Sequence, residues 1–216
     1  LPKQYSELAG EPIIVRTIKV FQETDEVDTI VLSVHSDYYN HMNELVEKYN
    51  LDKVKEIAIG GDERQNSVTN ALHTKSVENA DIVLVHDAVR PLLTTDLVSR
   101  VIEETEEFGA VIPGREPQET IKERNSSGRI IKTYDRSKLA SVQTPQGFWQ
   151  ELILSAYKTA NETGFIGTDS SALVEYIGYR VQMIEGEEAN IKITTLLDKK
   201  IAEMLLAERK EMKDNA

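Results

Sequence analysis

An acidic and a basic residue directly follow the segment with the clearest strand pattern. Residues 81–86 read Asp-Ile-Val-Leu-Val-His, and Asp87 and Arg90 come next. Because Mg²⁺ prefers carboxylate oxygens and a guanidinium pairs with anionic oxygens, this spacing suits a site that holds a magnesium–phosphate complex. The alternative is an Asp–Arg pair that only closes a loop.

A pair of glycines marks a second candidate site. Gly60 and Gly61 follow another short apolar segment, and they precede Asp62 and Ser67. Glycines let a flat ligand approach backbone amides, and the Ser67 hydroxyl, on the first turn of an expected helix, is suited to reading the edge of a base. The alternative is a glycine turn in which Asp62 caps that helix.

Two lysines lie in short segments next to residues typical of loops and turns rather than on charged helix faces. They are Lys3, between Pro2 and Gln4, and Lys192, within Asn190-Ile191-Lys192-Ile193-Thr194. Phosphoryl-type transfer needs cations that neutralise the charge growing on the equatorial oxygens, which a lysine can do. The alternative for each is an ordinary solvated lysine.

The composition narrows the class of protein. The 216 residues are 40% hydrophobic and 29% charged, with a formal net charge of -12, which argues against a nucleic-acid binder. There are no cysteines, and the 4 histidines form no His-x-x-x-His pair, so thiolate chemistry and a histidine metal pattern are excluded. No apolar run approaches the length that spans a bilayer, and we expect a cytoplasmic protein.

Strand and helix patterns alternate through the first half of the chain. Strands are expected at residues 28–34, 56–59 and 81–86, and helices at 12–21, 37–49, 64–76 and 94–108. Repeated alternation with short connections predicts an α/β fold with a Rossmann-like, doubly wound, mostly parallel sheet. Ligands bind such a sheet at the carboxyl ends of its strands, which is where both candidate sites fall.

The pattern changes after Pro113. Residues 119–124 and 129–134 alternate as two strands around Asn125-Ser126-Ser127-Gly128, a good hairpin turn. The hairpin has few large apolar residues, and since an isolated hairpin is marginally stable, we expect it to project and pack on a partner subunit. Helices at 150–162, 170–176 and 196–209 and a strand at 179–185 follow. We therefore expect a single domain over residues 1–216, with 115–142 as a dimerisation arm.

Five segments together resemble the 2-C-methyl-D-erythritol 4-phosphate cytidylyltransferases and the closely related ribitol 5-phosphate cytidylyltransferases. They occur in the order and approximate spacing of that family, from Leu1 to about Ala207. The segments read GGDERQNSV, VHDAVRP, DRSKLASVQTPQGF, GTDSSALVE and NIKITT. The resemblance implies a magnesium-dependent enzyme that joins CTP to a polyol phosphate and releases pyrophosphate, with the polyol phosphate itself as the nucleophile.

The resemblance also implies roles for individual residues. Cytosine would be recognised by Gly61, Asp62 and Ser67, and Asp87 would lie beside the magnesium with Arg90 supporting the same wall. Lys3 and Lys192 would flank the α-phosphate in the transition state. The polyol phosphate would be held by Thr144 and Thr168, and by residues of the arm that reach the neighbouring subunit of a homodimer: Thr120, Lys122 and Arg136.

Two departures from the family pattern leave alternatives open. The family begins with a strand and a glycine-rich, arginine-containing loop that grips the triphosphate, whereas this chain begins at Leu1, after that position; the lack of an initiator Met favours an incomplete record. Glu119 replaces a usual aspartate and Leu196 a common proline. The segments around Thr168 and Arg136 favour methylerythritol phosphate, and residues 34–49 look more like the ribitol enzymes. A catalytically inactive nucleotide-binding homologue is the further alternative.

Overall fold

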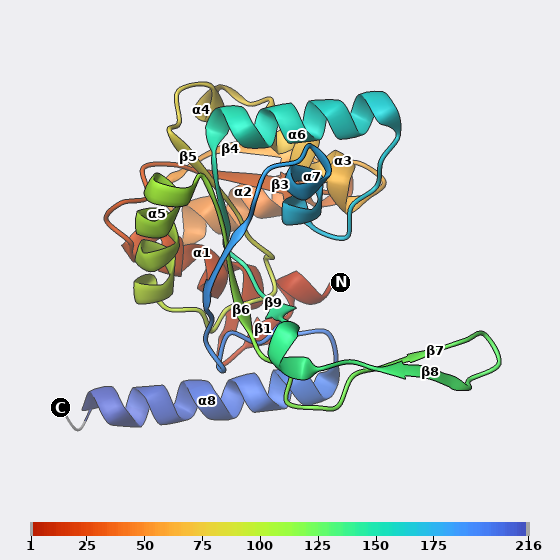
Figure 1. The fold of residues 1–216 in the computed structure, drawn as a ribbon. Helices are drawn as coiled ribbons and strands as arrows, with labels where there is room; N and C mark the ends of the chain where they lie inside the picture. Colours follow the sequence, from red (N-terminus) through yellow and green to blue (C-terminus); the bar gives the residue numbers. More distant parts are fainter. Residues whose placement is uncertain (1, 215–216) are drawn as a thin grey trace.

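The computed structural model describes residues 2–214, and its centre is a mixed β-sheet (Figure 1). The strand order is β11-β6-β10-β5, with β9 also paired to β6. β11 is parallel to β6, and β10 is antiparallel to both β6 and β5. The bounds are β5 (Ile82–Val85), β6 (Ala110–Arg115), β9 (Ser141–Val142), β10 (Gln146–Trp149) and β11 (Gln182–Glu185).

The strands expected at 81–86 and 179–185 are confirmed, but the sequence pattern missed β6 and β10. Five of the six residues of β6 are buried, and Pro113 lies within the strand. A strand covered on both faces shows no polar–apolar alternation, and a proline argues against a central strand, so the pattern appeared to break there.

β3 (Ile30–Val34) and β4 (Val54–Ile59) form a separate parallel pair. Among residues 2–214, no strand lies hydrogen-bonded between β3 and β5, so the expected continuous sheet is in two parts. A cavity of about 690 Å³ separates them, lined mainly by β3, β5 and the helices on either side. One end of this cavity reaches Arg64, Ser67 and Asp87.

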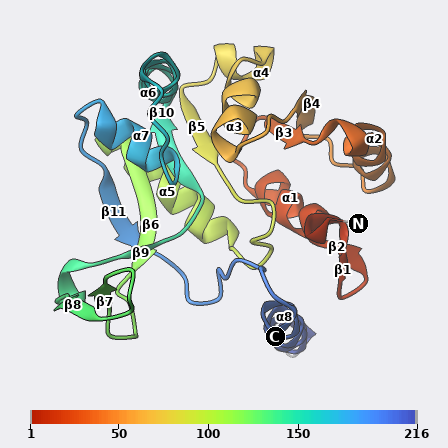
Figure 2. The same cartoon turned by 90° about the vertical axis from the view of Figure 1, so that its right-hand side faces the viewer.

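Helices cover both faces of the sheet, which confirms the doubly wound prediction (Figure 2). Phe21 and Val98, from the two helices on one face, share an apolar cluster with Leu84, whereas Leu72 and Tyr157 share one with Val85 on the other. The first face carries α1 (Ile13–Glu23) and α5 (Thr95–Phe108), with α2 (Tyr39–Lys48) beside β4; the second carries α3 (Arg64–Leu72), α4 (Lys75–Glu78), α6 (Gln150–Thr163) and α7 (Ser170–Tyr176).

Local signals explain several helix ends. Thr94 caps α5 by accepting a hydrogen bond from the Leu97 N–H at 3.1 Å. The helix expected over 64–76 ends instead at Leu72, and α4 begins anew after Thr74. The short elements are η1 (Lys3–Tyr5), β1 (Glu7–Leu8), β2 (Glu11–Pro12), η2 (Ser36–Tyr38) and η3 (Arg136–Lys138).

The predicted hairpin projects from the body as an arm (Figure 1). β7 (Lys122–Arg124) and β8 (Ile130–Thr133) pair only with each other. In the turn, the Asn125 Oδ1 accepts hydrogen bonds from the Ser127 and Arg129 N–H groups, and Gly128 takes the left-handed φ of 83° that glycine tolerates. Ile130 and Ile131 are 57% and 61% exposed.

The last helix, α8 (Leu196–Asp214), is longer than expected and runs along one end of the molecule (Figure 1). Its Ala202 packs in a small apolar cluster with Leu8, Leu92 and Ile193. None of the helices in residues 2–214 combines the length and apolarity needed to cross a membrane.

Candidate functional site

Charged side chains gather beyond the carboxyl ends of β4 and β5. Asp87 follows β5, and its carboxylate lies 3.0 Å from the Lys192 Nζ, 3.4 Å from the Arg90 Nε and 3.7 Å from the Arg64 Nε. We call these four residues the Asp87 cluster. Three cations around one carboxylate leave a surplus of positive charge, which suits a site that binds an anion.

The Asp87 carboxylate is mostly buried, with a side chain only 14% exposed. Burial raises the pKa of Asp87, but the hydrogen bond and charge of Lys192, together with the charges of Arg64 and Arg90, outweigh it and lower the pKa below the ordinary value. Asp87 is therefore ionised at neutral pH.

Thr144 ties the opposite wall to Asp87. Its Oγ1 accepts a hydrogen bond from the Asp87 N–H at 3.2 Å and lies 2.9 Å from the His86 Nδ1. Burial among protein atoms lowers the pKa of His86 to about 4, so its ring is neutral at pH 7. The His86 Nε2 faces the Arg90 carbonyl at 3.4 Å, and since a carbonyl only accepts, Nε2 carries the ring hydrogen and Nδ1 accepts from the Thr144 hydroxyl. Only acceptor capacity on this hydroxyl then remains for a ligand.

Lys192 is held between two anchored neighbours. The Asn190 carbonyl accepts a hydrogen bond from the Arg90 Nη1 at 2.7 Å, and the Ile193 N–H donates to the Val89 carbonyl at 2.9 Å. The Lys192 side chain remains 43% exposed. The ammonium group is therefore fixed at its base and accessible at its tip.

The glycine-pair segment forms a tight turn beside this cluster. Gly61 donates its N–H to the Ser67 Oγ at 3.1 Å. Asp62 is exposed, and the capping alternative considered for it is wrong: Glu63 caps α3 in a capping box with Asn66. Asp62 is therefore not needed to hold the helix.

Thr168 lies on an exposed loop tied to the same helix. The Gln65 side chain donates to the Phe165 carbonyl at 3.0 Å and accepts from the Gly167 N–H at 3.2 Å. The next residue, Asp169, accepts a hydrogen bond from the Gln146 Nε2 at 2.8 Å. This hydrogen bond connects the segment of Thr168, one residue before Asp169, to the segment of Thr144, two residues before Gln146.

Four predicted site residues are not brought to the Asp87 cluster within one chain. Lys3 is exposed in η1, and its ammonium makes no hydrogen bond or ion pair with residues 2–214. Lys122 donates to the Thr133 Oγ1 within the arm, and Arg136 pairs with Glu116 at 3.2 Å. Thr120 is exposed on the same arm. Within one chain the arm points away from the body (Figure 1).

The sequence reasoning missed Arg64 and Asn190. Arg64 opens α3 inside the GGDERQNSV segment, and a cation just after a glycine pair was a usable signal for an anion site. Asn190 is fully buried, and only the folded chain shows what its amide contacts.

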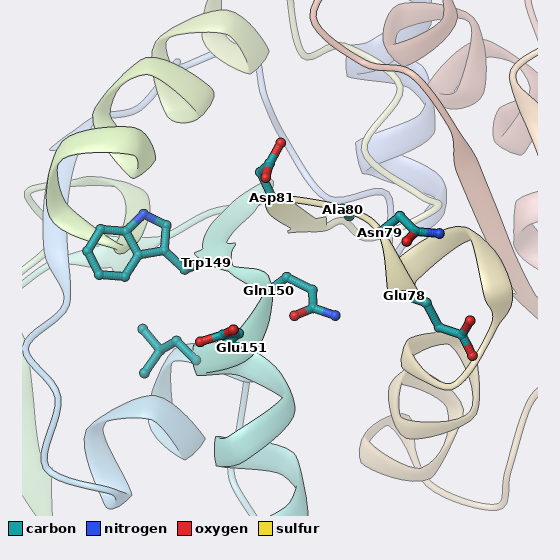
Figure 3. Close-up of a pocket in the computed structure, with 8 residues that line it drawn as sticks. Glu78, Asn79, Ala80, Asp81, Trp149, Gln150 and Glu151 are labelled. Carbon is teal, nitrogen blue, oxygen red and sulfur yellow. The ribbon is translucent and has the colours of Figure 1, made fainter.

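A second pocket, of about 740 Å³, lies beside Trp149 and contains none of the predicted site residues (Figure 3). Its walls carry the acidic side chains of Glu78, Asp81 and Glu151. That charge is unsuited to a phosphorylated substrate, so the Asp87 cluster remains the candidate site.

The described residues can hold a divalent cation only in part. Residues 2–214 contain no group of three or more His, Asp or Glu side chains arranged to bind a metal. Asp87 offers an ionised carboxylate at the cluster. Because Mg²⁺ commonly binds through one or two carboxylates plus substrate phosphates and waters, Asp87 fits a metal that arrives with a nucleotide.

The fold and the cluster define a class. A doubly wound α/β sheet with an excess of cations at the carboxyl ends of its strands belongs to a nucleotide-binding α/β protein. Residues 1–208 match the family described as 2-C-methyl-D-erythritol 4-phosphate cytidylyltransferase, and the chain belongs to that family.

Individual relatives agree with this assignment. The chain is 41% identical over 207 residues to the 2-C-methyl-D-erythritol 4-phosphate cytidylyltransferase of Geobacillus kaustophilus, covering 96% of this chain and 90% of the relative. It is 40% identical over 205 residues to that of Clostridium acetobutylicum, covering 94% and 89%.

Solved structures agree as well. The crystal structure of the Thermus thermophilus 2-C-methyl-D-erythritol 4-phosphate cytidylyltransferase matches with a TM-score of 0.81 at 28% identity, covering 95% of this chain and 94% of the other. The 4-diphosphocytidyl-2C-methyl-D-erythritol synthase of Anaerococcus prevotii matches with a TM-score of 0.84 at 28% identity, covering 93% and 88%.

Proposed function

We propose that this chain transfers the cytidylyl group of CTP to 2-C-methyl-D-erythritol 4-phosphate, giving the CDP-polyol and pyrophosphate in isoprenoid precursor synthesis. The observation that carries the proposal is the Asp87 cluster, an anion site at the carboxyl ends of the strands in a chain of this family. The relatives that carry the name of this reaction cover nearly the whole chain.

The reaction needs little covalent chemistry from the protein. A phosphate oxygen of the polyol forms a bond to the α-phosphorus of CTP, and the bond from that phosphorus to the bridging oxygen of the β-phosphate breaks. Pyrophosphate leaves with the bonding electrons. Negative charge grows on the non-bridging α-phosphate oxygens during this exchange, and the Lys192 ammonium stabilises it there. Lys3 acts from the opposite side, as the family resemblance suggests.

Substrate binding falls to the residues around the cluster. Gly61, Asp62 and Ser67 bind cytosine through backbone and side-chain hydrogen bonds, and the turn beside Arg64 supports this role. Arg90 keeps the Asp87 wall in place. Thr144 and Thr168 bind the polyol phosphate region, with Thr144 acting as an acceptor because its hydroxyl hydrogen is engaged by His86.

Mg²⁺ is part of the proposal. Asp87 would hold it together with phosphate oxygens and water, in line with the ionised carboxylate that Asp87 offers at the cluster. When bound, the metal neutralises triphosphate charge.

The functional unit is proposed to be a homodimer located in the cytoplasm. Residues 1–216 form one domain, and 115–142 serve as a dimerisation arm that carries Thr120, Lys122 and Arg136 into the partner's site. The exposure of Ile130 and Ile131 on the arm supports this, since apolar side chains on a projecting hairpin are suited to burial against a partner.

Pyrophosphate release tests the function directly. The chain is incubated with CTP, Mg²⁺ and either 2-C-methyl-D-erythritol 4-phosphate or ribitol 5-phosphate, and CTP is replaced by ATP, GTP or UTP in parallel. We expect turnover with CTP and methylerythritol phosphate. A preference for ribitol phosphate would replace the acceptor, and a lack of turnover with either acceptor would favour an inactive nucleotide-binding homologue.

A further inference from the structure

The cationic side chain of Lys192 depends on a buried amide two residues earlier in the chain. Asn190 is fully buried, and its Nδ2 donates to the Thr144 carbonyl at 2.9 Å and to the Gln143 Oε1 at 3.2 Å. Its own carbonyl accepts from Arg90. One residue thus joins three segments: the loop after β5, the loop before β10 and the loop that carries Lys192.

Gln143 is hydrogen-bonded to the same loop at Glu187. Its Nε2 donates to the Glu187 carbonyl at 2.7 Å, and its Oε1 accepts from the Glu187 N–H at 3.1 Å. A Cβ at Gly186 would come within 2.6 Å of this Oε1, so the close approach needs glycine there. Both polar atoms of the Gln143 amide therefore hold the segment before Lys192.

Asn190 is connected to both residues of the Lys192–Asp87 ion pair. Thr144, whose carbonyl Asn190 binds, accepts the Asp87 N–H on its hydroxyl. Lys192 is only two residues along the chain from Asn190. The buried Asn190 amide therefore fixes the distance between the Lys192 loop and the Thr144 segment. Moving these segments apart would leave buried polar groups unpaired, which is costly.

We propose that Asn190 is a positioning residue, which holds the Lys192 ammonium against Asp87 at the distance that the transfer step needs. It does not touch substrate; it acts through Lys192. This rests on the proposed function for its kinetic readout, but the placement of Lys192 can be measured without turnover.

The kinetic test is a double-mutant cycle of Asn190→Ala and Lys192→Ala. A misplacement of about 1 Å can cost roughly 10²-fold in rate, so we expect Asn190→Ala to lower kcat by about 10- to 10²-fold with a small change in the KM for CTP. In the Lys192→Ala background, Asn190→Ala should lower kcat little further, because the residue it positions is gone. Multiplicative losses would overturn the proposal.

A matched control separates positioning from loss of stability. Thr105 is equally buried and bonds only within α5, where its Oγ1 donates to the Val101 carbonyl. Thr105→Ala should lower the melting temperature and leave kcat near the wild-type value. If kcat falls equally in this control, the loss of any buried polar side chain lowers kcat, and the proposal fails.

The structural test is independent of the reaction. In the crystal structure of the unliganded Asn190→Ala protein, the Lys192 Nζ should no longer lie 3.0 Å from the Asp87 Oδ2. An unchanged ion pair would overturn the positioning role even in an active enzyme. If Asn190→Ala does not fold, Gln143→Met, which removes one of the two acceptors of Asn190, should displace Lys192 in the same direction; an undisplaced Lys192 there would again overturn it.

Discussion

Asp87 is ionised because of its neighbours rather than its exposure. Its carboxylate is held by Lys192, Arg64 and Arg90, which together offset the cost of burying its charge. Each of these cations contributes to the site differently. Arg90 is nearly buried and bonded to backbone, whereas Lys192 keeps an accessible tip. Lys192 and Arg64, with side chains 43% and 38% exposed, are therefore the cations of the cluster that a substrate can reach.

Lys192→Ala should lower kcat by about 10² to 10³-fold, because a preorganised charge near the reacting oxygens is lost. The fold should persist, since the side chain is 43% exposed. Steady-state pyrophosphate release and a thermal melt measure the two effects. The control is Lys158→Ala, which removes a lysine that is 76% exposed in α6. Wild-type turnover in the Lys192 variant would remove this residue from the mechanism.

Asp198 stabilises the start of α8 in a pH-dependent way. Its Oδ2 accepts hydrogen bonds from the Thr194 hydroxyl at 2.7 Å, the Thr194 N–H at 2.8 Å and the Thr195 N–H at 2.7 Å. These bonds, with the Thr194 hydroxyl first, lower the pKa of Asp198 to about 2. A lowered pKa means that the stabilisation is complete above the unfolded-state pKa of about 3.9 and is lost as the pH falls towards 2.

We therefore expect Asp198→Asn to melt at a lower temperature than the wild type at pH 6. The difference should shrink as the pH is lowered from 4 towards 2, as measured by thermal melts followed by circular dichroism. Asp25→Asn serves as the control, because the Asp25 side chain makes no hydrogen bond or ion pair with residues 2–214. A difference that is constant with pH would show that the capping carboxylate does not act through its charge.

At the scale of the elements, β3 and β5 each leave one edge without a partner strand among residues 2–214. β10 is hydrogen-bonded on both sides, whereas β3 and β5 each have one paired edge and one edge on the cavity of about 690 Å³. Unpaired edges of central strands expose backbone groups that a neighbouring strand would satisfy. The cavity is also lined by Arg64 and Asp87 of the cluster, so motion of the strand edges around it would reach the site.

Hydrogen exchange should reveal the unpaired edges. Amides of β3 and β5 that point away from their single partner strand should exchange much faster than those of Gly147 and Phe148 in β10, which pairs with β5 and β6. Exchange followed by mass spectrometry or NMR measures this in the isolated chain. Equal protection in all three strands would show that both edges are paired in solution.

At the scale of the molecule, the arm projects from the body and carries Thr120, Lys122 and Arg136, which we propose complete the site of a partner chain. Its strands pair only with each other, and its isoleucines are exposed. Arg136 is held at the arm's base by Glu116 and the Gln118 carbonyl, so its position relative to the arm is set within one chain. In the proposed homodimer, Arg136 would enter the site of the second chain.

Mixing two inactive variants tests this exchange. Arg136→Ala has an intact Asp87 cluster and a defective arm, and Lys192→Ala has the reverse. Random pairing of equal amounts makes half of the dimers mixed, each with one complete site, so about a quarter of the wild-type activity should return if arms are shared across a two-fold axis. Each variant alone measures the background. No recovery after proven subunit exchange would place the arm and the cluster of one site in the same chain.

The sequence by itself determined much of the fold and part of the site. The alternation of apolar segments was enough for the doubly wound layout, and turn chemistry around Asn125 and Gly128 was enough for the arm, because both depend on local spacing. Asp87, Arg90 and Lys192 could be selected because strand ends and punctuated segments are visible along the chain.

Only the tertiary structure decided the rest. β6 and β10 are buried on both faces and so carry no alternation, and β6 contains a proline that local rules place elsewhere. The meeting of Arg64 with Asp87, and of Asn190 with Thr144, joins residues 23 and 46 positions apart. Such contacts depend on how the strands assemble rather than on the local sequence of either segment.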